Sequence, residues 1–348
     1  MRSYLEARGG DYENVVFFGL QAFIKQYLSK PITMADVDFA EQVITAHGTP
    51  FNRAGWERIV TDHAGYFPVE IEAVPEGTVM APGNVQVQIV NTDPRLPWLT
   101  SYVETALLRS IWYPSTVASE SRFAKGIIME GLKITSEDPE GQIAFKLHDF
   151  GARGASSAET AMLGGMAHLV NFMGTDTFEG VLGAMKFYGA DMPGFSIPAS
   201  EHSTITSWGR ERELEAFENM LDSYPTGIVA CVSDSYDLMR AVNVYWGDKL
   251  RDKIMNREGT LVVRPDSGNP VTTPIEVIEA LMEKFGYEVN AKGYKVLPPQ
   301  VRVIQGDGLT PAIISQLVSA LIEHGISIDN IAFGMGGRSS PETGSRHM

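Results

Sequence analysis

The sequence predicts an α/β protein in which an irregular, TIM-like parallel barrel follows a smaller mixed α+β N-terminal domain. Three observations support this prediction. After about residue 141, short apolar runs alternate with glycine-containing loops and helix-like segments, as parallel strands joined by helices do. Residues 1–140 instead mix helix-like stretches with a β-rich piece. A chain of 348 residues is long enough for two unequal domains. We therefore expect domains at 1–140 and 141–337 and an aberrant tail at 338–348.

The N-terminal part contains a β-rich piece, residues 69–91, which prolines divide into short strands. Its stretch Gly83 to Val90 alternates apolar and polar residues, which predicts a half-exposed strand. From Leu96 to about Leu132 the apolar spacing becomes helical, and Tyr113-Pro114 is expected to interrupt the helix. We expect this helical stretch to join the two domains.

The second part contains repeated units in which an apolar run ends in a polar loop. They lie at 143–151, 227–237, 260–268, 300–308 and 328–337. Amphipathic helices are predicted at 274–285 and 311–322. Because parallel strands end at the same edge of a sheet, the polar residues after them should converge on one face. The aspartates expected there are Asp149, Asp234, Asp266 and Asp307.

Composition narrows the function. A net charge of −15 argues against general binding to nucleic acids or anionic membranes, which requires a surplus of basic residues. Small anionic substrates would need local cations, backbone amides or a metal ion. The sequence shows no apolar run near the roughly 20 residues that span a bilayer and no signal-peptide pattern. With a single cysteine, Cys231, this predicts a cytoplasmic protein whose cysteine belongs to the core rather than to a catalytic site.

The first barrel unit leads into Ser156 to Glu159, a pattern that predicts a capping box at the start of a helix. A helix N-terminus with Arg153 beside it suits a phosphate group. Phe150 is either a core side chain or a platform on which a planar ring stacks, and its glycine-flanked position favours the platform.

Later units carry further polar residues. Arg264 and Asp266 flank a proline and can be held as a rigid pair, although a structural salt bridge explains the same pattern equally well. The glycines around Asp307 and in Gly334 to Gly337 let the backbone approach phosphate oxygens, but they also make ordinary turns.

His202 is predicted to lie in a loop entered through residues 197–199. A lone histidine is more often a structural group than a catalytic one. A carboxylate such as Asp234 on one ring nitrogen would make the other nitrogen a better nucleophile. The sequence by itself does not show this contact.

Taken in order, the motifs HDFGARG, GTDT, PASEHSTIT, VSDSYD, RPDSGNP, VIQGDG and IAFGMGG resemble the strand-end motifs of nicotinamide phosphoribosyltransferases. The resemblance runs from Ser3 to Gly337. It implies a type II phosphoribosyltransferase barrel and a homodimer with shared active sites. The implied reaction converts nicotinamide and phosphoribosyl pyrophosphate to nicotinamide mononucleotide and pyrophosphate in NAD salvage. ATP would assist through a phosphohistidine and Mg²⁺ would be required, with no protein residue assigned as a metal ligand.

The resemblance also implies roles for individual residues. Phe150 resembles the aromatic residue that stacks on the nicotinamide ring, and Asp176 the carboxylate that accepts a hydrogen bond from the amide. His202 resembles the phosphorylated histidine and Asp234 its orienting partner. The remaining residues resemble phosphate and ring contacts (Arg8, Arg153, Arg264), a ribose acceptor (Asp266) and the sugar-phosphate cradle (Gly306, Asp307, Gly336, Gly337).

Three alternatives stay open. In a nicotinate phosphoribosyltransferase, the carboxylate of Asp176 would repel that of the substrate, so the amide is preferred. A catalytically impaired family member would bind ligands without turnover. An unrelated barrel enzyme that binds a sugar phosphate would direct Phe150 and His202 away from the strand ends.

The chain departs from the family pattern at both ends. The family's initial Thr-Asp-Ser-Tyr-Lys segment is missing here, and its tyrosine stacks on nicotinamide from the partner subunit. After residue 337 the family continues Gly-Leu-Leu-Gln-Lys, whereas residues 338–348 read RSSPETGSRHM. We hypothesise a frameshift, because codons for this tail exist that, read one base out of frame, encode Gly-Leu-Leu-Gln-Lys-Leu-Asp-Arg-Asp-Thr. A cloning tag or linker is the alternative, and the DNA of the gene distinguishes the two.

Overall fold

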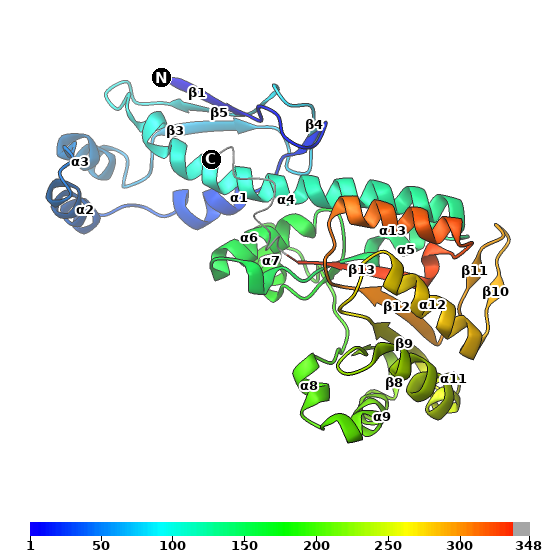
Figure 1. The fold of residues 1–348 in the computed structure, drawn as a ribbon. Helices are drawn as coiled ribbons and strands as arrows, with labels where there is room; N and C mark the ends of the chain where they lie inside the picture. Colours follow the sequence, from blue (N-terminus) through cyan, green and yellow to red (C-terminus); the bar gives the residue numbers. More distant parts are fainter. Residues whose placement is uncertain (337–348) are drawn as a thin grey trace. The chain divides into compact units, whose positions relative to one another are not determined.

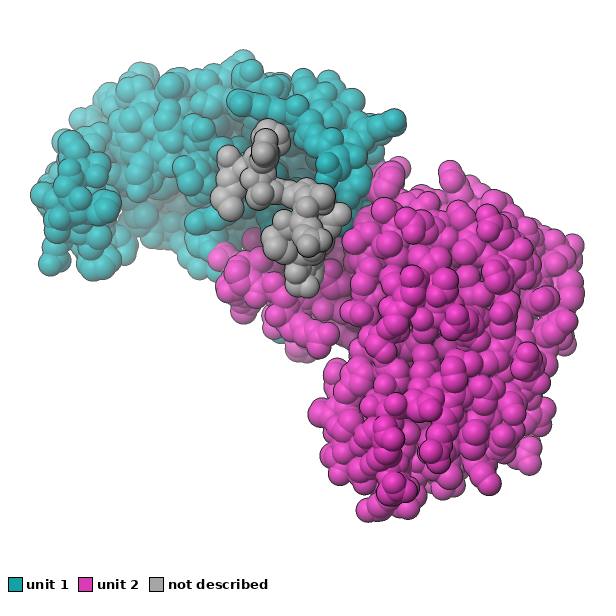
Figure 2. Space-filling view, viewed as in Figure 1, with its two compact units in different colours: residues 1–120, 182–191 teal, residues 121–181, 192–348 magenta. Residues whose placement is uncertain are grey.

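The computed structural model describes residues 1–336, so Gly337 and the tail at 338–348 lie outside the described residues. The chain divides into two compact units, coloured separately in Figure 2. Unit 1 comprises residues 1–120 and 182–191, and unit 2 comprises residues 121–181 and the chain from Met192 onward. Unit 2 therefore begins before the boundary predicted at residue 140.

Unit 1 is built on a three-stranded antiparallel sheet of order β1-β5-β3. Phe17, Val87 and Ile89 are among the side chains of its apolar core. Strand β5 alternates buried and less buried residues over most of its length, which confirms the strand expected near residues 83–90. The elements of this part are β1 (Arg2–Glu6), β2 (Val15–Val16), α1 (Leu20–Phe23), the π-helix η1 (Ile24–Leu28), α2 (Met34–Ala46), α3 (Arg53–Asp62), β3 (Val69–Ala73), β4 (Val79–Met80) and β5 (Val85–Asn91).

The long helix α4 (Leu99–Thr135) passes from unit 1 into unit 2, as expected for a connecting helix. The predicted interruption at Pro114 is wrong, because the helix continues through it. Proline removes the N–H that would bond the carbonyl of Ser110. Gly19 packs against this turn, where a Cβ atom would lie 2.3 Å from the Ser110 carbonyl oxygen. Tertiary packing thus holds the helix together at the residue where local preference would end it.

Unit 2 contains a six-stranded sheet of order β7-β6-β13-β12-β9-β8, in which all neighbouring strands are parallel. Four of these strands, β13, β12, β9 and β8, are labelled in Figure 1. Five of these strands fall in the predicted units. Periodicity did not predict the sixth, β7, because two residues without an apolar run give no periodic signal, although they belong to the GTDT motif. The strands are β6 (Leu147–Asp149), β7 (Gly174–Thr175), β8 (Thr226–Val232), β9 (Glu258–Arg264), β12 (Val301–Gln305) and β13 (Ile331–Met335).

Helices surround this sheet, and α12 and α13 confirm the two predicted amphipathic helices. The α-helices are α5 (Pro139–Gln142), α6 (Ala158–His168), α7 (Phe178–Tyr188), α8 (His202–Thr206), α9 (Glu213–Ser223), α10 (Leu238–Arg240), α11 (Arg251–Met255), α12 (Thr272–Phe285) and α13 (Pro311–Glu323). Shorter elements are the 3₁₀ turns η2 (Ile143–Phe145), η3 (Ala152–Gly154), η4 (Arg210–Arg212) and η6 (Ile328–Asn330), the π-helix η5 (Ala241–Lys249) and the hairpin of β10 (Glu288–Val289) and β11 (Lys295–Val296).

Alternate residues of the sheet face two different apolar clusters. Val229, Cys231 and Val263 belong to the large core shared with the helices, so the expected core position of the cysteine is confirmed, and burial raises the pKa of its thiol to about 12. Ala230 and Val262 face the other side of the sheet. No helix in the described part of the chain is long and apolar enough to cross a membrane.

One extended segment, residues 195–200, links the two edges of this sheet and is called the closing segment below. Phe195 forms a parallel bridge with Gly174 on edge strand β7, and Ala199 forms one with Ala230 on edge strand β8. Between these bridges, Ile197 packs against the apolar cluster of Ala230, Val262 and Ile304 on the inner side of the sheet. The parallel sheet is thereby closed by a single segment of chain, which confirms the predicted irregular α/β barrel.

Candidate active site

Aromatic rings occupy the inner face of the sheet because glycines leave room for them. A Cβ atom on Gly334 would lie 2.0 Å from the ring of Phe150, and one on Gly306 would lie 3.1 Å from it. A Cβ atom on Gly174 would meet the His148 ring at 2.7 Å. The Phe150 ring therefore lies over glycines of β13 and of the β12 exit, where it is half-buried. Its outer face is a flat apolar surface of the kind on which planar rings stack.

Asp176 lies beside Phe150 at the end of the neighbouring strand. The pairs His148 with Gly174 and Asp149 with Thr175 fix the register of β6 and β7, so Phe150 and Asp176 follow as the next pair. The backbone N–H of Asp176 donates to the Asp149 carbonyl oxygen over 2.9 Å. An aromatic platform and a carboxylate are thus placed side by side.

The carboxylate of Asp176 already has one partner, because the hydroxyl of Ser196 donates a hydrogen bond to its Oδ1. His148 lies nearby, and burial lowers the pKa of its imidazole although the charge of Asp176 acts in the opposite direction. Neither Ser196 nor His148 was singled out in the sequence, since an exposed serine in a loop and a histidine in a strand carry no distinctive spacing.

His202 and Asp234 are in contact. The Nε2 atom of His202 lies 3.0 Å from Oδ1 of Asp234, whose side chain is only 4% exposed, against 44% for the histidine. His202 was predicted in a loop, but it is the first residue of the short helix α8. Pairing of the closing segment with Ala230 on β8 brings this helix to the end of the strand that precedes Asp234.

The second oxygen of Asp234 is held by the next strand exit. The backbone N–H of Asp266 donates to Oδ2 over 3.1 Å, and the Ser267 hydroxyl donates to the same atom. With two donors on Oδ2, Oδ1 remains to accept from His202. Because a carboxylate only accepts, Nε2 of the histidine carries the hydrogen. In the neutral ring the lone pair then lies on Nδ1, which is 3.8 Å from Oδ2 of Asp266.

Arg264 and Asp266 form the salt bridge that the sequence left as one alternative, with Nη2 and Oδ2 2.9 Å apart and both side chains mostly buried. Burial acts to lower the pKa of the guanidinium, but its hydrogen bonds to Asp266 and the surrounding carboxylates outweigh this and raise it. The pair places a fixed positive charge and an acceptor at the edge where His202 lies. Asp149, by contrast, closes a local turn by accepting from the N–H of Gly151 over 2.8 Å.

Exposed groups complete the strand-end face. Arg153 lies in the turn η3 that leads to α6. The capping box predicted from Ser156 to Glu159 is wrong, because Ser157 is the N-cap of α6 and makes a single cap bond, accepting from the N–H of Thr160. Asp307 is exposed after β12, and Gly336 is exposed after β13. Arg8, an exposed residue of unit 1, and Gly337, outside the described residues, keep their roles as predictions.

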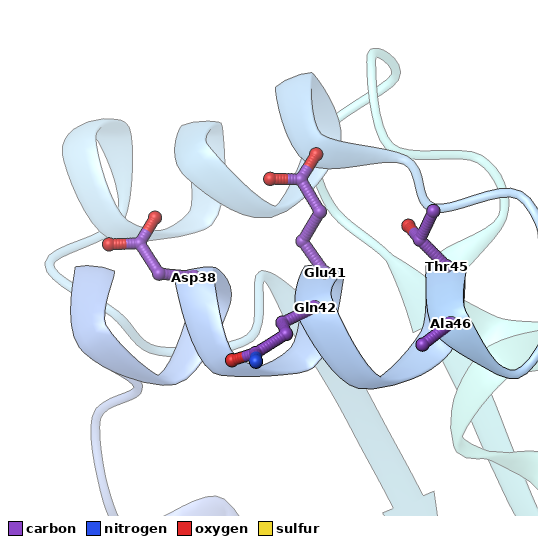
Figure 3. Close-up of a pocket in the computed structure, with 5 residues that line it drawn as sticks. All are labelled: Asp38, Glu41, Gln42, Thr45 and Ala46. Atoms are coloured by element: carbon purple, nitrogen blue, oxygen red, sulfur yellow. The ribbon is translucent and has the colours of Figure 1, made fainter.

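A shallow hollow on α2 offers no comparable chemistry. Figure 3 shows its lining, which is Asp38, Glu41, Gln42, Thr45 and Ala46. Both carboxylates already form ion pairs with Arg53. Within the described residues, no group of three or more His, Cys, Asp or Glu side chains forms a metal-binding set.

The comparisons with known proteins agree with these motifs. Residues 145–343 match the nicotinate phosphoribosyltransferase (NAPRTase) family, and residues 1–71 match the N-terminal domain of nicotinamide phosphoribosyltransferase. A nicotinamide phosphoribosyltransferase of Xanthomonas campestris pv. campestris is 52% identical over 336 residues, covering 96% of this chain and 71% of the relative. One from Acinetobacter baylyi is 32% identical, covering 93% of this chain and 70% of the relative.

Solved structures share the fold at low sequence identity. Human nicotinic acid phosphoribosyltransferase aligns with a TM-score of 0.61 at 18% identity, covering 96% of this chain and 68% of that one. A nicotinate-nucleotide pyrophosphorylase from Pyrococcus furiosus aligns with a TM-score of 0.55 at 18% identity, covering 97% of this chain and 64% of that one. These similarities support the barrel architecture.

Proposed function

Because the chain belongs to the nicotinate and nicotinamide phosphoribosyltransferase family, we propose that it transfers a phosphoribosyl group to nicotinamide in NAD salvage. The substrates are nicotinamide and phosphoribosyl pyrophosphate, and the products are nicotinamide mononucleotide and pyrophosphate. The observation that carries the proposal is the Phe150 ring over its glycines with the carboxylate of Asp176 beside it. This arrangement suits a flat pyridine ring that bears an amide donor.

Transfer requires one bond to form and one to break at the anomeric carbon of the ribose. The pyridine nitrogen supplies the electron pair of the new C–N bond, and pyrophosphate leaves with the electrons of the C–O bond. Stacking on Phe150 and hydrogen bonding to Asp176 orient the nucleophile. The fixed charge of Arg264 and the exposed guanidinium of Arg153 suit the negative charge that builds on the leaving group.

His202 is assigned the role of phosphate acceptor for ATP. Its Nδ1 atom carries the lone pair, because Nε2 is committed to Asp234. Attack on the γ-phosphorus forms an N–P bond while the P–O bond to ADP breaks. The side chain is exposed enough for a nucleotide to reach it.

Magnesium is part of the proposal through the substrates rather than through a protein cage. Mg²⁺ keeps several waters and is usually bound by one or two carboxylates with substrate phosphates. When bound, it would neutralise phosphate charge. Asp307 is an exposed carboxylate at this edge that suits such a role. A homodimer with shared sites and a cytoplasmic location complete the proposal.

The test is an assay of purified protein with nicotinamide, phosphoribosyl pyrophosphate, Mg²⁺ and ATP, with the mononucleotide detected by chromatography. We expect product from nicotinamide, and more of it with ATP than without. Ligand-induced thermal stabilisation measured in parallel separates a protein that binds without turnover from one that does not bind. If nicotinate gave product and nicotinamide gave none, the role assigned to Asp176 would be contradicted.

A further inference from the structure

Ser196 is held beside Asp176 by backbone pairing. The adjoining residue of the closing segment, Phe195, donates its N–H to the Met173 carbonyl over 2.8 Å and accepts from the Thr175 N–H over 2.9 Å. These bonds fix the chain on both sides of the β7 bridge. The Ser196 hydroxyl is consequently placed where it donates to Oδ1 of Asp176.

This hydrogen bond determines what the two groups can still offer to a ligand. A carboxylate has no proton to donate, so the hydroxyl hydrogen of Ser196 is committed to Asp176. Only acceptor sites remain on both groups: the free oxygen of Asp176 and the lone pairs of Ser196. An amide NH₂ brings two donors to such a pair, whereas a carboxylate brings none and adds a like charge.

We propose that Ser196 is a positioning residue that sets the preference for nicotinamide over nicotinate by holding Asp176 as an oriented acceptor. The inference rests on the proposed function and deepens it. Without the hydroxyl, the Asp176 side chain is free to rotate away from its present orientation. His148 on β6 is a titratable group near the carboxylate, and its lowered pKa keeps it from supplying a competing positive charge at neutral pH.

The experiment compares kcat/KM for nicotinamide with kcat/KM for nicotinate in the unmodified protein and in Ser196→Ala. Loss of a hydrogen bond to a charged group changes a rate or binding ratio by about 10-fold to 100-fold. We therefore expect the ratio of kcat/KM for nicotinamide to kcat/KM for nicotinate to fall by at least about 10-fold. Ser196→Thr keeps a hydroxyl and should restore most of the preference. Ser207→Ala removes an exposed hydroxyl that bonds only the carbonyl of Thr204 and should leave the ratio unchanged.

The outcomes separate the inference from the function beneath it. An unchanged ratio in Ser196→Ala, with turnover retained, overturns the role of Ser196 and leaves the proposed function standing. An unmodified protein that prefers nicotinate overturns the proposed function and the inference with it. If turnover is absent, the ratio of dissociation constants for nicotinamide and nicotinate, measured by calorimetry, decides the same question for the same variants.

Discussion

Replacing Gly334 with alanine should displace the ring of Phe150. The added Cβ atom would lie 2.0, 2.5 and 2.8 Å from three ring atoms, whereas carbon atoms in contact are about 3.5 to 4.0 Å apart. The ring must therefore move by about 1.5 Å. Overpacking of this kind costs about 1 to 3 kcal/mol of unfolding free energy. A displaced stacking surface should also lower kcat/KM for nicotinamide by about 10-fold to 100-fold.

Urea denaturation and steady-state kinetics measure both effects, and neighbouring glycines provide a graded series. Gly306→Ala, with its Cβ atom 3.1 Å from the same ring, should perturb the ring less, and Gly336→Ala should leave the ring in place because its nearest contact is a backbone oxygen at 3.5 Å. Gly126 lies on an exposed helix surface, where an added Cβ atom would meet nothing within 4 Å. Gly126→Ala is therefore the control for the effect of a glycine-to-alanine substitution that creates no contact. The double variant of Gly334→Ala with Phe150→Leu should recover stability. Equal stability and kinetics in Gly334→Ala and the unmodified protein would refute the reasoning.

Three further predictions follow from charges in the same unit. Asp234→Asn should lower the ATP-dependent phosphate labelling of His202 by about 10³-fold or more. The amide NH₂ would face Nε2 and force the ring hydrogen onto Nδ1, which removes the attacking lone pair. Incorporation of label from labelled ATP, measured in protein shown to be folded, tests this prediction. Lys146 is buried and donates to three backbone carbonyls, and burial lowers its pKa from 10.5 to about 7. Since the unfolded chain binds the extra proton between these values, the unfolding free energy should rise with pH from about 7 to 10, and urea titrations of Lys146→Met should lose this rise. Burial raises the pKa of Glu213 from 4.5 to about 6, so stability should fall as pH rises through that interval, and melting temperatures of Glu213→Gln should show no such fall.

Features that depend on a single strand and on the residues that directly follow it could be predicted from the sequence. The five apolar runs became strands, and the aspartates after them lie at their ends, because burial on both faces of a parallel sheet leaves a continuous apolar signal. Gly334 was considered only as a possible phosphate contact or turn residue, although its place inside an apolar strand carried a more specific signal. A glycine inside an apolar strand indicates close approach by another group, and here that group is the ring of Phe150.

Other features depend on contacts between distant segments and had no local signal. The helix through Pro114 persists because of packing in unit 1. Ser267 became part of the site only because the exit of β9 lies next to that of β8, where its hydroxyl reaches Asp234. Hydrogen-bond partners of this kind are decided by strand order, which a single sequence does not reveal.

The closing segment explains why the two ends of the candidate site belong together. Ser196, near its start, orients the carboxylate beside the Phe150 platform, and His202, just beyond its end, meets Asp234. Backbone bridges at Phe195 and Ala199 tie this short stretch to opposite edge strands. The proposed ring-binding group and the proposed phosphate acceptor are therefore placed by the same pairing that closes the barrel. Ser196 and His202 are six positions apart because the segment between them runs from edge strand β7 to edge strand β8.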